Sequence, residues 1–251
     1  MTRTLAAVLL VLLPGATSLR GDTLSELRTT LASLRGTKPI EATIDLQRTR
    51  KSSGRFSNSQ SQGGATFGVR ADASGLSLTI SQALLDRAAA ETRERQADPK
   101  KQMPTRAAID EIEATNMVEA LNFAEPLQRL LRIGAVTGEK RVAFQNRSSR
   151  QLTLKLTEPL PPQAASIFNV QFSQDHLNIW IADDGTPLGA ERVRKGSAKF
   201  LFLRGEMNSR ESWHFTRRDD RLVVSRFEAS FAGSGFGQKG EGRTVQTVTP
   251  K

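Results

Sequence analysis

Apolar and polar residues alternate along much of the second half of this chain. Because side chains two residues apart share one face of a strand, the alternation predicts short antiparallel strands from Ile167 to Phe231. Polar clusters suited to turns separate them, most clearly at Asp183 to Pro187, where an Asp-Gly step precedes a proline. Further breaks are predicted at Gln174-Asp175, at 204–208 and at 217–220. The alternating apolar residues are Phe168, Val170, Phe172, Leu177, Ile179, Ile181, Phe200, Phe202, Trp213, Phe215, Leu222 and Val224.

The first half of the chain predicts a leading helix and then strands. Leucines at helical spacing indicate a helix that begins near Asp22 and continues to Leu34. Alternation then predicts a strand from Ile40 to Leu46 and a hairpin from Ala65 to Ile80. The polar residues 51–64 between them are rich in Ser and Gly, which is typical of a loop or of the tip of a long hairpin.

The apolar period changes from two to about 3.6 at Ser81, which predicts a helical section from about 81 to 133. Its first helix is expected to turn Leu85 and its apolar neighbours inward, and a second is expected to span Ile109 to Leu121. Asn122 and Glu125 have the spacing of a capping box for a third helix. Since strands are predicted on both sides of this section, we expect it to cover one face of a sheet.

Two further elements complete the predicted fold. Alternation predicts a hairpin at 142–156 and a final edge strand at Thr244 to Val248. The expected fold class is therefore α+β, with an antiparallel sheet covered on one face by the central helices. We expect residues 19–251 to form a single α+β domain.

The N-terminal residues 1–18 have the pattern of a secretory signal peptide. Arg3 precedes an unbroken apolar run, Pro14-Gly15 ends the run, and small residues follow at the expected cleavage position. The run is too short for the roughly 20 residues that cross a bilayer. We therefore expect a periplasmic or secreted protein whose mature chain has no transmembrane helix; a short buried helix or an uncleaved anchor is the alternative.

Charge and composition narrow the choice of partners. The formal net charge of +10 favours anionic partners, including an anionic membrane surface, although basic and acidic residues are interspersed as on a solvated surface. Nucleic acid is not expected, because the chain lacks aromatic residues interleaved with the basic ones. There is no cysteine, which excludes thiolate catalysis, cysteine metal sites and lipid attachment through an N-terminal Cys.

Residues that carry catalytic or metal chemistry are few. His176 and His214 have no carboxylate at a motif spacing, so a metal or acid-base site would require carboxylates from elsewhere in the fold. Asp183 and Asp184 are interpreted as turn residues, and Gly233 to Gly237 lacks the following helix that a phosphate-binding loop needs. We therefore predict no catalytic residue, no metal, no cofactor and no enzymatic activity.

Two predicted strands are apolar on both faces, namely Leu177 to Ile181 and Lys199 to Leu203. Such strands are covered on both sides, either by a tightly packed core or by helices on one side and a ligand on the other.

The segment from Leu177 to Leu188, Leu-Asn-Ile-Trp-Ile-Ala-Asp-Asp-Gly-Thr-Pro-Leu, resembles a strand, acidic turn and proline-bearing strand of the LolA/LolB-like family of bacterial lipoprotein carriers. A leading helix followed by a strand at Ile40 to Leu46 is similar to the order of elements in that family. The resemblance is partial, covering mainly Ile167 to Phe231, and no residue here matches the family's ligand-contacting arginine. It implies a strongly curved sheet, an incomplete barrel, with helices closing over an apolar cavity for acyl chains. The whole chain also resembles uncharacterised exported bacterial proteins.

These observations lead to a functional hypothesis. We expect a non-catalytic periplasmic carrier or chaperone that shelters a lipid or lipoprotein acyl group. The alternative is a structural or interaction module of the cell envelope that has no small-molecule ligand. An enzyme is the third hypothesis, and it would require His176 or His214 to meet carboxylates in a cleft. The residues expected to line the apolar cavity are Leu127, Leu130, Leu131, Phe168, Phe172, Ile179, Phe200, Phe202, Trp213 and Phe215.

Overall fold

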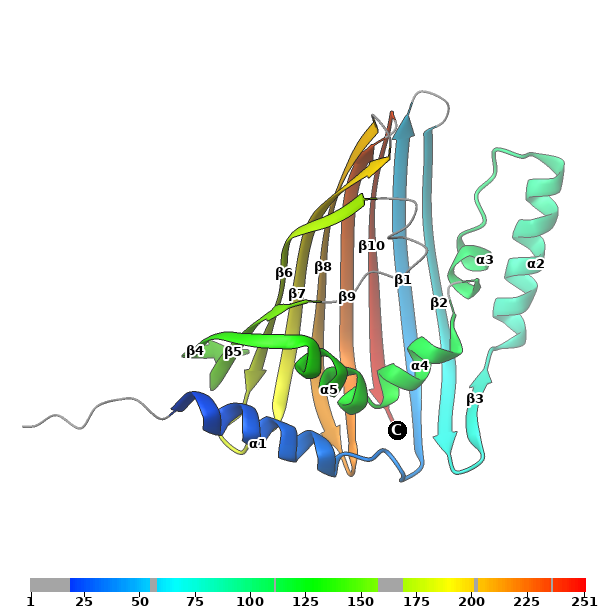
Figure 1. Ribbon diagram of the computed structural model, residues 1–251. Helices are drawn as coiled ribbons and strands as arrows, with labels where there is room; N and C mark the ends of the chain where they lie inside the picture. Colours follow the sequence, from blue (N-terminus) through cyan, green and yellow to red (C-terminus); the bar gives the residue numbers. More distant parts are fainter. Residues whose placement is uncertain (1–18, 55–57, 111, 158–168, 201–202, 236) are drawn as a thin grey trace, which may run out of the picture.

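A computed structural model describes residues 19–54, 58–110, 112–157, 169–200, 203–235 and 237–251. The predicted signal peptide and the candidate residues Phe168 and Phe202 lie outside the described residues. Ten strands form one antiparallel sheet in the order β3-β2-β1-β10-β9-β8-β7-β6-β5-β4 (Figure 1). The strands are β1 Ile40–Gly54, β2 Asn58–Asp72, β3 Gly75–Thr79, β4 Gly134–Phe144, β5 Arg147–Leu156, β6 Asn169–Ile181, β7 Pro187–Phe200, β8 Leu203–Arg218, β9 Arg221–Gly235 and β10 Gln238–Pro250.

The sheet is curved and is not closed into a barrel, since β3 and β4 stand at its two edges. Five helices accompany it among the described residues, α1 Leu19–Ser33, α2 Gln82–Ala97, α3 Pro104–Ile109, α4 Ala114–Leu121 and α5 Ala124–Ile133. Helices α1, α4 and α5 cross the lower part of one sheet face, which we call the inner face, while α2 and α3 lie beside β2 (Figure 1). The predicted α+β class, with a curved antiparallel sheet under helices, is confirmed.

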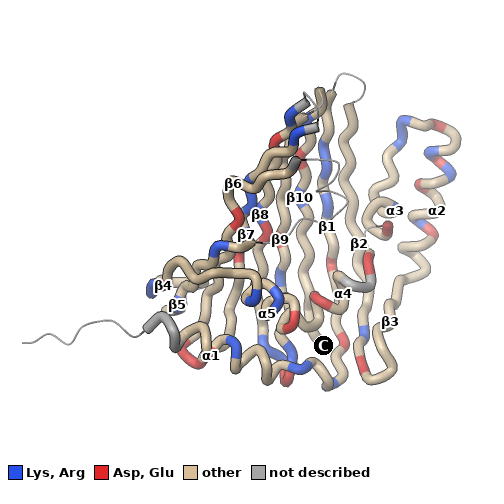
Figure 2. The backbone as a smooth tube through the Cα atoms, viewed as in Figure 1, with Lys and Arg blue, Asp and Glu red and all other residues tan. Residues whose placement is uncertain are grey.

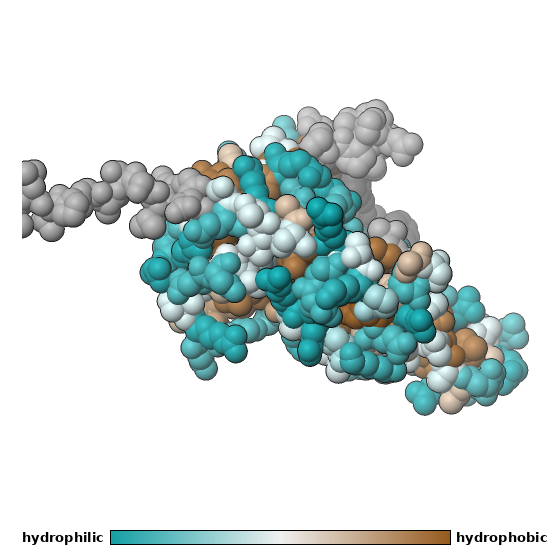
Figure 3. All heavy atoms as spheres, turned by 90° about the horizontal axis from the view of Figure 1, so that it is seen from below, coloured by the Kyte–Doolittle hydropathy of each residue, from teal (hydrophilic) through white to brown (hydrophobic). Residues whose placement is uncertain are grey.

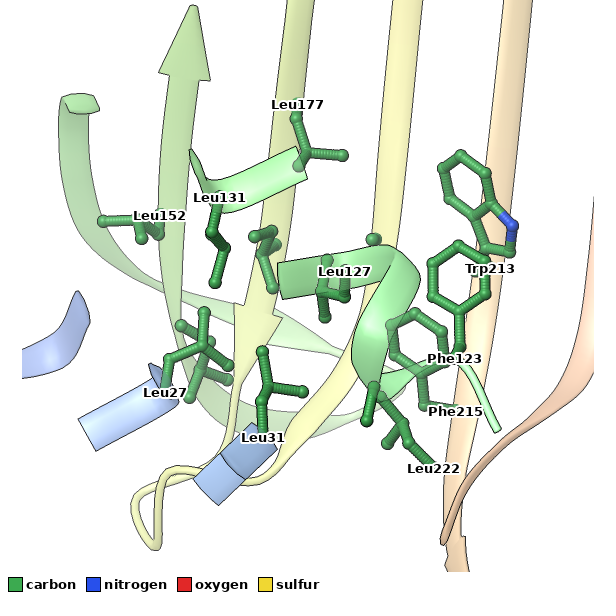
Figure 4. Packing of buried hydrophobic residues seen from close by; sticks show 14 of the residues in the cluster. Leu27, Leu31, Phe123, Leu127, Leu131, Leu152, Leu177, Trp213, Phe215 and Leu222 are labelled. Atoms are coloured by element: carbon green, nitrogen blue, oxygen red, sulfur yellow. The ribbon is translucent and has the colours of Figure 1, made fainter. Parts of the chain in front are cut away.

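Alternation explains why the lower half of the sheet is packed. In β1, Ala42, Ile44 and Leu46 are buried, whereas the residues between them are more exposed. A first core cluster joins α1 and α5 to strands β5 to β9, and Figure 4 shows Phe123 beside Trp213 and Phe215 in it. A second cluster joins α3 and α4 to β1, β2 and β10. The helices therefore cover the part of the inner face that is apolar in sequence.

Two predicted breaks lie inside continuous strands. Gln174-Asp175 belongs to β6, where the register with β7 shifts between Phe172 and Gln174, and residues 204–208 belong to β8. The prediction of breaks there was wrong because polar residues in these strands find partners across the sheet. The carboxylate of Asp175, for example, pairs with Arg192 on β7.

The C-terminal strand also differs from the prediction. β10 was expected at an edge, but it lies between β1 and β9 and pairs with both. The glycine-rich residues 233–235, expected to interrupt the pattern, continue β9 and pair with β8 and β10. Residues 51–54 and 58–64 belong to the far end of a long hairpin of β1 and β2, the second of the two interpretations of that segment.

The helical section differs in its details. The helix predicted from Ile109 to Leu121 is divided into α3 and α4. Asn122 makes no capping box; its side-chain oxygen accepts hydrogen bonds from the backbone N–H groups of Ala124 and Leu222, at 3.4 and 3.2 Å. Leu85 is exposed, because α2 lies beside the sheet edge rather than on the sheet face.

Candidate functional site

The upper part of the inner face from β1 across β10 to β7 is the candidate site, because no described helix crosses these strands there (Figure 1). The register of the strands places its residues in rows that run across β1, β10, β9, β8 and β7. The row nearest the helices is Leu46, Gln246, Phe227, Trp213 and Ala190. The rows that follow are Arg48, Thr244, Ala229, Glu211 and Arg192; then Arg50, Gly242, Phe231, Ser209 and Arg194; then Ser52, Gly240, Gly233, Met207 and Gly196; and last Gly54, Gln238, Gly235, Gly205 and Ala198.

One strand carries an apolar path across all five rows. Its residues, which we call the β9 track, are Phe227, Ala229, Phe231, Gly233 and Gly235. At roughly 3.4 Å per residue, the track is about 27 Å long. Beside it, Gly240 of β10 carries no side chain, so the backbone forms part of the floor there. The β9 track therefore leads from the covered core to the open end of the sheet.

Large apolar side chains remain exposed along this path. Phe231 is 43% exposed and Met207 is 37% exposed. The Phe231 ring lies over Gly242, since a Cβ atom added at Gly242 would be 2.3 Å from its Cε1. Met207, Phe231, Gly233 and Gly235 line a groove of about 530 Å³. The site thus combines exposed apolar groups with a floor of small residues.

A smaller cavity adjoins the covered end of the track. It measures about 320 Å³ and lies between α4 and the sheet, with Met117, Phe123, Trp213 and Phe227 among its lining residues. Ala229 also lines it. The β9 track therefore contributes residues to both hollows, its first part to the smaller and its last part to the larger.

Charged side chains cross the inner face between the packed core and the open end. Arg192 binds Asp175 with two parallel hydrogen bonds, from Nε to Oδ1 at 2.9 Å and from Nη2 to Oδ2 at 2.7 Å. Both side chains are buried, at 8% and 6% exposed. Arg194 lies 3.5 Å from Glu211, and the Arg50 guanidinium lies 5.9 Å from the centre of the Phe231 ring. These residues form what we call the arginine belt, completed by Arg48.

The residues predicted from sequence to line a cavity lie mostly in the packed core. Leu127, Leu131, Ile179 and Phe215 are buried in the first cluster, and Leu130 packs against it. Trp213 belongs to that cluster and also lines the smaller cavity. Phe172 lies on the open part of the sheet, over Gly196. Phe200 belongs to β7, but its side chain is outside the described set, as are Phe168 and Phe202 altogether.

Sequence reasoning missed Phe231, Met207 and the glycines as site residues. A signal for them was present. Gly233 and Gly235 are two residues apart, as are Gly240 and Gly242, which is the spacing of residues on one face of a strand.

The two histidines lie apart from this site. His214 contacts Gln145 and the Phe144 ring, and burial together with Arg226 holds its pKa below the ordinary value. His176 contacts Gln174. Within the described ranges, no group of three or more His, Cys, Asp or Glu side chains is placed to hold a metal ion.

Comparisons with known proteins add little. No protein-family model matches the chain, and no curated protein matches it. Among solved structures, it is similar to a chain in the complex structure of Pseudomonas aeruginosa MucA/MucB, with 11% sequence identity, a TM-score of 0.19, and coverage of 90% of this chain and 94% of that chain. This likeness is too low to assign a family. None of the described helices has the length and apolar character needed to cross a membrane.

Proposed function

We propose that this chain is a non-catalytic carrier or chaperone that shelters the apolar chain of a lipid or lipoprotein on the open part of its inner face. The observation that carries the proposal is the exposure of Phe231 and Met207 in a groove that is also lined by glycines, at the open end of the β9 track. Exposed apolar surface of this kind marks sites where apolar partners bind. The groove is open, so a ligand can enter without unfolding the helices.

The energetics of such binding are simple. Each methylene removed from water contributes about 0.8 kcal/mol, and the glycine floor allows an extended chain to approach the backbone closely. The β9 track offers a straight path along one strand, so an acyl chain fits it better than a bulky compact ligand does. No covalent step is required, which agrees with a role in sheltering rather than in catalysis.

We also place this role in the cell envelope. The N-terminal residues 1–18 have the composition of a secretory signal, and a cysteine-free chain is suited to an oxidising compartment. Acyl chains and anionic lipid surfaces are both present there. The basic open end of the sheet fits an anionic membrane surface.

A blocking variant tests the proposal. Gly240→Leu places a side chain in the groove, and a Cβ atom there would meet nothing closer than the Lys51 backbone oxygen at 3.9 Å. Gly138→Leu is the matched control, because an added Cβ on β4 also meets open space and lies away from the groove. We expect Gly240→Leu to weaken binding of a fluorescent fatty acid at least tenfold and Gly138→Leu to leave it unchanged.

Native mass spectrometry of protein purified from its own envelope supplies an independent measurement, and we expect a co-purified lipid or lipoprotein. Protein that is always empty and binds no fluorescent fatty acid would contradict the carrier function. A stoichiometric crosslink to one envelope protein, with no lipid found, would instead support the interaction module.

A further inference from the structure

One cross-strand row sets two arginines on either side of the apolar track. The register places Arg50 beside Gly242, Gly242 beside Phe231, Phe231 beside Ser209, and Ser209 beside Arg194. Each arginine is therefore two strands from Phe231, or about 10 Å at the usual spacing of strands. The two guanidinium groups flank the place where the track enters the open groove.

Two buried polar atoms in this row have no hydrogen-bond partner among the residues that the structure describes. They are Nε of Arg194 and Oγ of Ser209, which belong to residues directly opposite one another on β7 and β8. Leaving a buried donor unpaired costs about 1–3 kcal/mol, so native structures nearly always supply a partner. Two donors on neighbouring strands fit one acceptor oxygen lying between them.

The charge of the arginine belt favours an anionic acceptor. Apart from the pair of Arg192 with Asp175, the described belt sets Arg50 and Arg194 against one carboxylate, that of Glu211. Asp175 is occupied by its bidentate pair with Arg192, and Glu211 approaches Arg194 only at 3.5 Å. Among the described residues, Arg50 contacts a ring face and forms no ion pair. The belt thus has an excess of positive charge beside an apolar path.

We infer that the preferred ligand is an amphiphile whose head group is an oxyanion, bound between Arg50 and Arg194 with the Ser209 hydroxyl, while its acyl chain lies on the β9 track. This inference rests on the proposed carrier function and narrows its ligand class. Carboxylates and phosphates share the required chemistry, because both accept charge-assisted hydrogen bonds from guanidinium groups. The ligand could be a fatty acid, which has a carboxylate head group, or an acidic phospholipid, which has a phosphate. Comparing the two head groups distinguishes these sources.

Probes with one chain and different head groups test the inference. Binding of palmitate, hexadecyl phosphate and hexadecanol is measured by competition with a fluorescent fatty acid. We expect both anions to bind at least tenfold more tightly than the alcohol. Tighter binding of the phosphate than of the carboxylate would identify an acidic phospholipid as the source, and the reverse order a fatty acid.

Substitutions test which residues cause the preference for an anionic head group. The single variant Arg50→Gln and the double variant Arg50→Gln with Arg194→Gln are both tested. Each is expected to reduce the ratio of anion affinity to alcohol affinity by tenfold or more. The affinity for the alcohol should stay within about twofold of that of the unaltered protein. Arg204→Gln is the control, since Arg204 is exposed and its one ion pair within the described part of the chain is with Glu206, which is also exposed. Because Arg50 is itself exposed, its single variant remains informative should the double variant fail to fold.

The outcomes separate this inference from the carrier function. Equal binding of palmitate, hexadecyl phosphate and hexadecanol by the unaltered protein would overturn the anionic head group and leave the carrier function in place. An anion preference that persists in Arg50→Gln would overturn the assignment to the arginine belt. Failure of all three probes to bind would contradict the carrier function itself.

Discussion

Asp220 illustrates how a single carboxylate connects distant parts of the chain. It lies in the turn between β8 and β9, where its side chain accepts hydrogen bonds from the backbone N–H and the hydroxyl of Thr37, both at 2.7 Å. The backbone N–H of Lys38 donates a third, at 3.3 Å. Together these bonds hold the segment between α1 and β1 against the end of the sheet.

These hydrogen bonds make the contribution of Asp220 to stability depend on pH. Burial works to raise the pKa of Asp220, but the hydrogen bonds from Thr37 and Lys38 outweigh it and hold the pKa below the ordinary value of 3.8. A carboxylate whose pKa is lowered by folding stabilises the protein above its unfolded pKa, and this stabilisation is lost as the pH falls through the folded pKa. We predict that Asp220→Asn lowers the free energy of unfolding by about 1 kcal/mol at neutral pH, and that this difference shrinks as the pH falls below the ordinary pKa of 3.8.

Urea unfolding of both proteins at neutral and at acid pH measures this difference. Asp98→Asn is the control, because among the described residues the Asp98 carboxylate bonds only to the nearby backbone N–H of Lys100. A gap between Asp220→Asn and the unaltered protein that stays constant from neutral to acid pH would show that the charge of Asp220 is not the cause.

At the scale of elements, the contact between α3 and β2 depends on one glycine. A Cβ atom added at Gly63 would lie 2.4 Å from the backbone oxygen of Pro104 and 3.3 Å from the backbone nitrogen of Ala108. Backbone atoms cannot rotate away as a side chain can. We predict that Gly63→Ala displaces α3, and with it α2, from the sheet edge.

Hydrogen exchange measures the displacement. We expect faster exchange across residues 82–109 in Gly63→Ala and little change in α1 and α5, which pack in a different cluster. Gly64→Ala is a matched control one residue away, since its added Cβ would meet only the Leu46 backbone oxygen at an ordinary 3.6 Å. Equal exchange in the two variants would contradict the prediction.

The elements also show which features the sequence determines locally. Strong alternation predicted the strand at Ile40, the hairpin of β2 and β3, and the turn at Asp183 to Pro187, because each depends on neighbouring residues alone. Polar residues such as Asp175 were taken for a break, since their partners lie on another strand. The position of β10 inside the sheet likewise depends on its pairing with β1, nearly 200 residues earlier in the chain.

The candidate site could not be predicted from neighbouring residues either, because it depends on pairing between strands that are distant in the sequence. The row that joins Arg50 to Phe231 and Arg194 exists only through the register of five strands. Sequence alternation identified the large apolar residues, and these became the packed core around Leu127 and Ile179. The open groove consists of small residues, which carry little hydropathic signal.

At the scale of the whole molecule, the two ends of the sheet differ. The end closed by α1 has a mostly hydrophilic surface with scattered hydrophobic atoms (Figure 3). At the opposite end the strands extend beyond the helices, and Lys and Arg residues are visible along the upper part of β1 and near the upper ends of the strands (Figure 2). Lys51 and Lys239 are exposed there and form no ion pair with any other described residue. The groove therefore opens at a basic end.

This arrangement predicts that the open end faces an anionic membrane surface. We expect the protein to float with vesicles that contain phosphatidylglycerol and not with vesicles of phosphatidylcholine alone. Binding should weaken with added salt, because the screening length falls from about 10 Å at 0.1 M to about 3 Å at 1 M. Basic groups near such a surface each contribute about 1 kcal/mol.

Two pairs of charge-reversing substitutions test where the protein contacts the membrane. Lys51→Glu with Lys239→Glu should abolish flotation, because both residues lie at the open end of the sheet. Lys38→Glu with Lys140→Glu changes the net charge equally at positions away from the groove and should leave most of the flotation intact. If both pairs reduced flotation equally, net charge alone would account for binding, and the basic open end would have no special role. Retained flotation in the first pair, with loss in the second, would place the membrane contact at the opposite end, which α1 closes.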